Sequence, residues 1–512
     1  MALDSPLQRR LSLFSLVMAV VTSTIGSGWL FAPYLSARLA GPASLLAWLA
    51  GGLMAFLIAL VFAELGALVS SSGALAQVPL LTHGRLAGFL GGWTAWLGYV
   101  ALPTIEVLAT VEYLGTVLPW LVQDHGGSSG LTPAGLAWAA VLLLLFGWIN
   151  LSGIDALARW INGLTVWKLL VPLATALVLI AVASHPTNLQ VGGVTVAGGL
   201  EALSTGGILF SLLGFRTAMD LAGEARQPQR DVPLAMGLGL GVSLAIYLVL
   251  QLAFLLAVPP ADLARGWGGL SLTAQGGPLV AVVLALGLPL LATLLITDAV
   301  VSPSATAMAY MGTAARVNWM MATLGLLPAR FASLNRAGVP ASALLATVAV
   351  GVLLLLAGPS WSAAVSLVTA ALVIALATGP VSLLALRRQR PDLPRPYRLP
   401  LAEVLCPLAF VAASWAIVWC GWSSLQLAVP VVLLPTLLQL ARGRGADGGG
   451  VLWWFPYLVG LALAAALFGP GRPWALPSWQ LLLVVAGFSL AIFPLALASR
   501  LDEPSPEAGL RL

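Results

Sequence analysis

The segment Thr22–Pro33, TSTIGSGWLFAP, lies inside the first long apolar stretch of the chain and interrupts it. A helix that crosses lipid must satisfy its own backbone hydrogen bonds, because no water is present to do so. Gly26 and Gly28 are poor helix formers, and Pro33 lacks a backbone donor. The segment therefore predicts a transmembrane helix that is broken near its middle and leaves backbone N–H and C=O groups free.

The composition indicates a membrane protein. The 512 residues are 60% hydrophobic and only 8% charged, and the mean hydropathy is +1.00. Soluble domains carry roughly 25% charged residues, so this chain lacks the polar side chains to cover a water-facing surface. We expect an all-α polytopic protein of the cell membrane, with the lipid bilayer as its surroundings, no nucleic-acid partner and no cleavable signal peptide.

Hydropathy predicts about fourteen spans of roughly 20 residues each. Between them the arginines gather on one side, and only Arg38, Arg265 and Arg472 fall on the other. By the positive-inside rule both termini are expected to be cytoplasmic. Two spans, 86–119 and 278–312, are long for one crossing and are expected to be tilted or to extend beyond the lipid. The predicted spans are 12–37, 42–69, 86–119, 133–151, 160–184, 201–222, 232–257, 278–312, 340–358, 361–386, 401–420, 423–441, 451–469 and 477–499.

A second interruption lies in the sixth predicted span. Its segment Leu203–Ala225, LSTGGILFSLLGFRTAMDLAGEA, contains Gly206, Gly207 and Gly214. Spans one and six are corresponding members of two five-helix halves, and glycine-interrupted spans at matching positions indicate a transporter's binding site. The ends of such half-helices offer N–H groups to a carboxylate and carbonyls to an ammonium group. The alternative is close helix packing at small residues, since the chain has 54 glycines.

Several stretches resemble the amino acid–polyamine–organocation (APC) superfamily of transporters. The first two spans resemble it in STIGSGWLFAPY and in the pattern AGPA, W, G, AEL and SG that follows. FSLLGFRTAMDLAGEARQPQRDVPLA is similar to the sixth helix of that superfamily and the loop after it, and ARVNWMMATLGLLPARFASLNRAGVPASALL to the loop between its helices eight and nine. The likeness covers residues 12–400. On GSGWLFAP, GWTAWLGY, LPTIEV and TDAVVSPS, the chain looks most like archaeal and bacterial members.

The resemblance implies the LeuT-type fold, in which a five-helix unit is repeated in inverted orientation. The first repeat is then expected at 12–184, and the second repeat with its following loop at 185–400. About four additional transmembrane helices are expected at 401–499. Short cytoplasmic segments at 1–11 and 500–512 complete this organisation.

The resemblance also implies site residues on both interrupted helices. Leu212 stands where relatives often have an aromatic residue and Arg216 where many have an acidic one, which puts the expected preference for the cargo's side chain in question. The residues expected to hold a substrate carboxylate, through backbone N–H groups and a small side chain, are Ile25, Gly26, Ser27 and Gly28. The residues expected around an unwound stretch from 210 to 214, whose carbonyls take the amino group, are Phe210, Ser211, Leu212, Leu213, Gly214 and Phe215.

Lys168, the only lysine of the chain, lies in the fifth predicted span. A charge at the bilayer centre costs roughly 2.5–3.5 kcal/mol on the insertion scale, so such residues are usually functional. Lysine is the cation that can release its proton when it is desolvated, and the resemblance places an ammonium group here in proton-coupled members. We expect Lys168 to carry the coupling proton. The alternative is a lysine that snorkels to the cytoplasmic face, since a helix beginning near residue 160 places it only about 12 Å along.

Four further charged residues are expected at membrane depth, as ionic or gating groups: Arg216, Asp220, Glu106 and Asp298. Arg216 can pair with Asp220 on the same helical face. If it is free instead, it can bind a substrate carboxylate, which would favour acidic cargo. Glu106 and Asp298 can partner Lys168 or Arg216, or relay a proton.

Taken together, these residues predict a secondary active transporter of amino acids, proton-coupled and working by alternating access. An exchanger, a polyamine or organic-amine carrier and a non-transporting amino acid sensor are the alternatives. An enzyme is not expected, because no nucleophile with a base lies at membrane depth. No metal site or cofactor is expected either, since the three histidines fall in predicted loops. The oligomeric state is left open.

Overall fold

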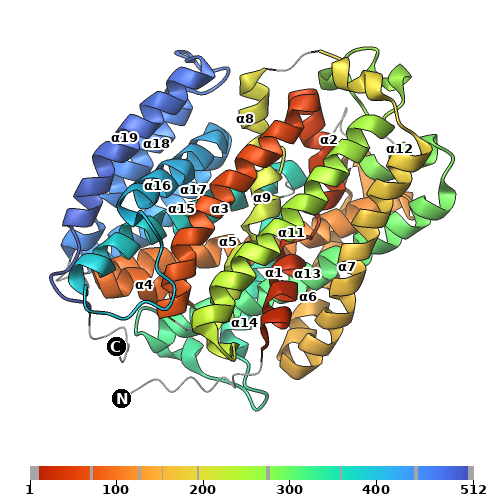
Figure 1. The fold of residues 1–512 in the computed structure, drawn as a ribbon. Helices are drawn as coiled ribbons and strands as arrows, with labels where there is room; N and C mark the ends of the chain where they lie inside the picture. The colour runs from red at the N-terminus through yellow and green to blue at the C-terminus, as the bar shows by residue number, and fades with distance from the viewer. Residues whose placement is uncertain are drawn as a thin grey trace.

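The computed structural model describes residues 11–69, 73–124, 129–152, 154–192, 195–272, 277–357, 360–442 and 448–505. Most of these residues are helical, and the only sheet among them is a small antiparallel pair of β1 (Val122–Asp124) and β2 (Ser129–Leu131). The helices lie side by side as a tilted bundle, in which α1 begins and α19 ends on the same side (Figure 1).

The described residues form nineteen α-helices, several of which are short pieces of interrupted spans. They are α1 (Leu13–Thr24), α2 (Gly28–Ala40), α3 (Ser44–Leu68), α4 (Ala74–His83), α5 (Arg85–Leu114), α6 (Pro133–Leu151), α7 (Ile154–Val182), α8 (Val196–Ser204), α9 (Ile208–Leu212), α10 (Thr217–Asp220), α11 (Pro228–Ala257), α12 (Pro278–Ala285), α13 (Pro289–Thr323), α14 (Ala341–Leu356), α15 (Trp361–Gln389), α16 (Ala402–Trp419), α17 (Gly421–Ala441), α18 (Trp454–Phe468) and α19 (Ser478–Ala498).

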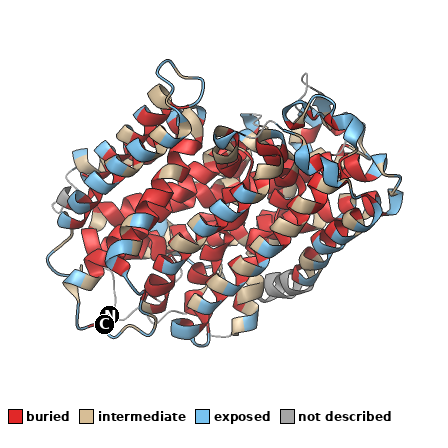
Figure 2. Cartoon of the chain, turned by 45° about the horizontal axis from the view of Figure 1, so that its top comes forward, coloured by how far each residue is buried: buried red, intermediate tan, exposed pale blue. Residues whose placement is uncertain are grey.

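The surface of the bundle is suited to lipid. In the described part of the chain, ten helical stretches are long and apolar enough to cross a membrane, or eleven if the bent pair Val196–Ser204 and Ile208–Asp220 counts as one span. Large apolar side chains face outward, for example Leu290, which is 85% exposed. Exposed and intermediate residues alternate along the outward faces of the helices, and buried residues fill the inside (Figure 2). The chain is therefore an all-α, multi-pass membrane protein, as the sequence predicts.

Every predicted span contains a helix, but two regions differ from expectation. The span 278–312 is not one tilted crossing: Gly287, with a left-handed φ of 70°, separates α12 from α13, which continues to Thr323. The helix α4 was not expected, and His83, predicted in a loop, is its last residue and is buried.

The helices α16 to α19 form a separate group beside the interrupted helices (Figure 1). The group packs on α3, α5 and α15 through α16 and α17. Most of the predicted segment 1–11 and the end of 500–512 lie outside the described residues, as does His125. The inverted repeat and the division into five segments remain predictions.

Candidate functional site

The first break lies between α1 and α2, where Ile25, Gly26 and Ser27 leave the α-helix. Ile25 has φ −92° and ψ 85°, outside the helical region. A Cβ atom on Gly26 would lie 2.5 Å from Oε1 of Glu106, so a side chain does not fit there. The glycine thus allows a carboxylate of α5 to approach the bare backbone.

Side chains from three other helices satisfy the backbone carbonyls at the end of α1. A helix end leaves its last carbonyls without intrahelical partners, and the surroundings here supply no bulk water. The side chains come from α7, α11 and α13, so these helices fix the position of the break. The contacts are Lys168 Nζ to Thr22 O (2.8 Å), Tyr310 OH to Ser23 O (2.9 Å), Tyr247 OH to Thr24 O (2.9 Å) and Ser302 Oγ to Ile25 O (3.4 Å).

The start of α2 holds a carboxylate. The N–H of Ser27 donates to Oε2 of the buried Glu106 at 2.7 Å. The first N–H groups of a helix lack backbone partners and carry partial positive charge, which favours anions. The arrangement shows that the backbone at this break binds a carboxylate group. Of the roles predicted for Glu106, a direct pair with Lys168 or Arg216 is not the contact seen here, where its carboxylate accepts from the backbone; the proton relay remains a prediction.

The second break lies between α8 and α9, at residues 205–207. Gly207 takes a left-handed φ of 81°, which only glycine adopts without strain, and the two helices are bent by 52°. The backbone is therefore not unwound from 210 to 214 as expected. Phe210, Ser211 and Leu212 are helical, and a 3₁₀ turn at Leu213–Arg216 follows.

The first break lies against α9 and the 3₁₀ turn, the segment that follows the second break. A Cβ atom on Gly28 would overlap the hydroxyl of Ser211, and one on Gly214 would lie 2.6 Å from the backbone N of Thr24. These glycines therefore allow α9 and the following turn to touch α1 and α2. The structure brings together the two groups of residues that the sequence singled out.

Lys168 is fully buried and bound to the first break. Its Nζ donates to Thr22 O and, at 2.5 Å, to Oγ1 of Thr306. The helix α7 begins at Ile154 rather than near 160, so Lys168 lies about 21 Å along it. Its full burial, with Nζ held by α1 and α13, favours an internal role over a lysine that snorkels to the membrane surface.

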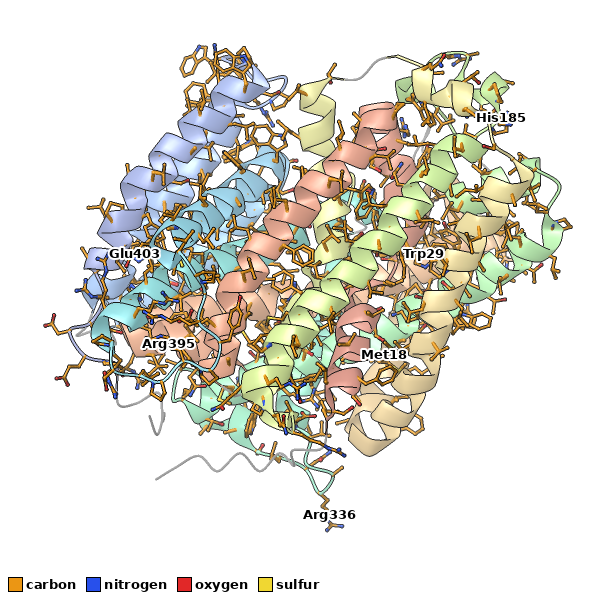
Figure 3. All side chains as sticks on the ribbon, in the orientation of Figure 1. Met18, Trp29, His185, Arg336, Arg395 and Glu403 are labelled. Atoms are coloured by element: carbon orange, nitrogen blue, oxygen red, sulfur yellow. The ribbon has the colours of Figure 1, made fainter. Side chains whose placement is uncertain are left out.

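Asp298 lies on the same side of the first break as Lys168. One of its oxygens accepts a hydrogen bond from Trp29 Nε1 at 3.1 Å, and the other has no hydrogen-bond partner among the described residues. Trp29 lies in the interior of the bundle (Figure 3). Glu106 and Asp298 thus bind Ser27 and Trp29 beside the break whose α1 end Lys168 holds, and no ion pair joins either carboxylate to Lys168 in the described ranges.

Arg216 and Asp220 are linked through Tyr99 and not directly. The Tyr99 hydroxyl donates to Asp220 Oδ2 at 2.5 Å, while the Arg216 guanidinium lies 4.7 Å from the Tyr99 ring centre and 5.4 Å from that of Tyr310. Within the described residues, the expected direct ion pair is therefore not formed. Arg216 is 1% exposed, and its Nε has no hydrogen-bond partner in the described part of the chain.

Aromatic residues that the sequence did not single out surround both breaks. Trp361 of α15 donates from Nε1 to Ser27 Oγ at 3.0 Å. It stacks on Phe31 with ring centres 4.7 Å apart and meets Phe210 edge-on at 5.9 Å. Trp361 thus covers the first break from one side. The sequence signal for such residues is a tryptophan or tyrosine inside an otherwise apolar span. Tryptophans and tyrosines of the aromatic belts at membrane surfaces give the same signal, so it does not identify a site residue.

Comparison with known proteins gives consistent matches over most of the chain. The model of the amino acid permease family matches residues 11–439. The glutamate/serine transporter AimA of Bacillus subtilis (strain 168) is 32% identical over 480 residues, which are 90% of this chain and 88% of that protein. The aspartate-proton symporter of the same organism is 32% identical over 473 residues, 90% of each chain. Its methylthioribose transporter is 23% identical over 80% of this chain and 88% of that protein.

Proposed function

This chain belongs to the amino acid permease family of the APC superfamily, and we propose that it is a secondary active transporter of amino acids. Its family is one of transporters, so the chain is not an enzyme. The observation that carries the proposal is the contact of the first break with the segment that follows the second break, at a backbone that already holds a carboxylate. The names of the two relatives at 32% identity support amino acids as cargo.

In this proposal the cargo is held by backbone groups at the two breaks. Its carboxylate binds the N–H groups at the start of α2, where Glu106 lies in the structure. Its amino group binds carbonyl and hydroxyl oxygens around the second break, where Ser211 faces Gly28. Loading therefore requires Glu106 to leave the N–H of Ser27. Trp361, which is bonded to Ser27, moves aside to admit cargo.

Lys168 couples this movement to a proton. The protonated amine donates to Thr22 O and Thr306 Oγ1 and so holds the end of α1 against α7 and α13. A neutral amine is a weaker donor, because charge-assisted hydrogen bonds are roughly twice as strong as neutral ones. Loss of the proton therefore frees α1 to move. Glu106 and Asp298, which lie beside the same break, are the groups to pass the proton on. One relative is named as a proton symporter, which supports this mode of coupling.

Arg216 favours acidic amino acids over polyamines. It is a second buried cation near the first break, since Tyr310 touches both its guanidinium and the carbonyl of Ser23. A polyamine would meet like charge at both Arg216 and Lys168, which costs free energy in a low-dielectric interior. A side-chain carboxylate would instead find a cation that has no ion-pair partner in the described ranges. The names of two relatives include glutamate and aspartate.

The experiment is uptake of labelled glutamate, aspartate, serine and putrescine into proteoliposomes that contain the full chain. Three conditions are compared: an inward proton gradient, an inward sodium gradient, and unlabelled cargo preloaded inside. We expect accumulation of the acidic amino acids with the proton gradient alone. Uptake only against preloaded cargo would show an exchanger, and dependence on sodium would remove the coupling role of Lys168. Failure of every amino acid to move under all three conditions would overturn the proposal.

A further inference from the structure

A groove of about 530 Å³ lies between α3, the first turns of α11 and residues 396–397 of the segment that follows α15. The two helices run side by side, and the segment that follows α15 crosses the lower end of α3 (Figure 1). The exposed side chains Leu60 and Leu234 line the apolar wall of the groove, while Arg230 and Tyr397 stand at its polar end. Both helices belong to membrane-spanning stretches, so the groove opens toward lipid.

The polar end of the groove is held in place by hydrogen bonds to a buried carboxylate. Glu64 of α3 is completely buried and binds Arg387 in the last turn of α15 and two groups of the segment that follows α15. Arg387 donates to it from Nε at 3.0 Å and from Nη2 at 2.5 Å, the N–H of Leu399 donates at 2.7 Å, and Arg395 Nε lies 3.1 Å from Oε1. Figure 3 labels Arg395 beside the lower part of α3. These bonds hold Tyr397 across the groove, next to Arg230.

Arg230 is available to a ligand. It is exposed, it is the third residue of α11, and no ion pair holds it in the described part of the chain. The start of a long helix adds partial positive charge at the same place. The groove is apolar along its length and ends at an arginine and a tyrosine hydroxyl. These two parts match the acyl chain and the polar headgroup of a phospholipid. Basic residues at a membrane surface select anionic headgroups, and guanidinium groups bind phosphate oxygens in pairs.

We propose that this groove binds an anionic phospholipid, with an acyl chain between α3 and α11 and the phosphate on Arg230. The lipid then joins three segments that are distant in sequence: α3, α11 and the chain after α15. Because it binds the folded protein, it raises the thermal stability of the purified chain by mass action.

The test measures lipid binding to the purified full-length chain in detergent, by native mass spectrometry and by the midpoint of thermal unfolding. The probes are phosphatidylglycerol, phosphatidylcholine and glycerol phosphate, the last being a headgroup without acyl chains. We expect phosphatidylglycerol to bind most tightly and to raise the unfolding midpoint. Glycerol phosphate should not change it, because the acyl chain supplies most of the contact area.

Two variants separate the acyl chain from the headgroup. Gly237→Leu fills the groove without overlap, since a Cβ atom there meets no atom within 4 Å, and Gly487→Leu is its control at an equally open glycine of α19. Arg230→Gln removes the headgroup contact, and Arg336→Gln, at an exposed arginine elsewhere, is its control.

We expect Gly237→Leu to abolish the stabilisation by phosphatidylglycerol. Arg230→Gln should lower the preference for phosphatidylglycerol over phosphatidylcholine about fivefold, as about 1 kcal/mol per basic residue predicts. Both controls should bind like the unmodified chain. Equal binding of phosphatidylglycerol by the groove variants and their controls would overturn the proposal, as would equal stabilisation by glycerol phosphate. Neither result depends on whether the chain transports amino acids.

Discussion

The two helix breaks are held by different kinds of contact. At the first break, carbonyls of α1 accept hydrogen bonds from Lys168, Tyr247 and Tyr310, which belong to three other helices. At the second break most of the bonds are local. Thr205 donates back to Glu201 O, Gly207 N to Ser204 O, and Ser211 Oγ to Gly207 O, while the Ser204 hydroxyl reaches Trp419 O of α16.

This difference indicates which break senses the state of the rest of the bundle. The second break is capped mostly by bonds within its own segment, whereas the end of α1 cannot move without breaking hydrogen bonds to α7, α11 and α13. In the proposed mechanism, the protonation of Lys168 therefore acts on the first break.

The largest effect is expected at Lys168. Lys168→Ala should abolish proton-driven accumulation of cargo, because the titrating donor at Thr22 O is gone. Lys168→Arg should also lose it, since arginine keeps the charge but cannot release its proton at physiological pH. Exchange of labelled for unlabelled cargo should persist in at least one of the two variants and shows that the chain is folded. Accumulation by Lys168→Ala at the unmodified level would contradict the assignment.

The second-largest effect is expected from a substitution at the point where the start of α2 touches α9. Gly28→Ala places a Cβ atom against the hydroxyl of Ser211. Overpacking of this kind costs typically 1–3 kcal/mol, so we expect cargo affinity, measured by equilibrium binding of labelled cargo, to fall about 5- to 150-fold. The double variant Gly28→Ala/Ser211→Ala should regain part of the loss. Gly487→Ala, at an open position of α19, is the control. Unchanged affinity in Gly28→Ala would place the cargo elsewhere.

The smallest effects should distinguish the two kinds of cap. Tyr247→Phe and Tyr310→Phe each leave one carbonyl of α1 without its donor, which costs about 1 kcal/mol, or about fivefold in the half-saturation constant for uptake. A hydroxyl that bonds back to its own helix contributes little. Thr205→Ala, which removes such a bond at the second break, should change uptake less than twofold. Similar losses in all three variants would mean that distant and local caps are equivalent.

Much of the fold could be predicted from the sequence, because lipid restricts a spanning segment to one kind of secondary structure. Long apolar runs therefore predict helices well. The predictions are wrong where side-chain polarity does not determine the backbone conformation. The run 278–312 is apolar throughout, so hydropathy joins α12 and α13 into one span, and only Gly287 followed by Pro289 marks the turn between them. The helix α4 is short and carries Gln77 and His83, which are typical of a loop.

The candidate site was predicted in part for the same reason. Gly26 and Gly28 stand close together with a proline beyond them, so the first break is evident from the sequence. The sixth predicted span, which carries the second interruption, has three candidate glycines. Only the structure shows that Gly207 takes the left-handed conformation. Trp361 could not be found, because it contacts Ser27 from more than 300 residues away and no local pattern records such a contact. The direct Arg216–Asp220 pair was expected from their spacing alone, which carries no information about Tyr99.

The central claim, that cargo is held at the first break, can be tested most directly by cysteine protection. With the two native cysteines, Cys406 and Cys420, replaced by alanine, a cysteine introduced by Ser27→Cys can be followed with a membrane-permeant thiol reagent in proteoliposomes. Ser27 is buried in the structure, so the reagent reports the opening of the first break during transport. Ser423→Cys, at an exposed position of α17, is the control. We predict that saturating cargo slows modification of Ser27→Cys severalfold and leaves Ser423→Cys unchanged. Equal modification of Ser27→Cys with and without transported cargo would contradict the account.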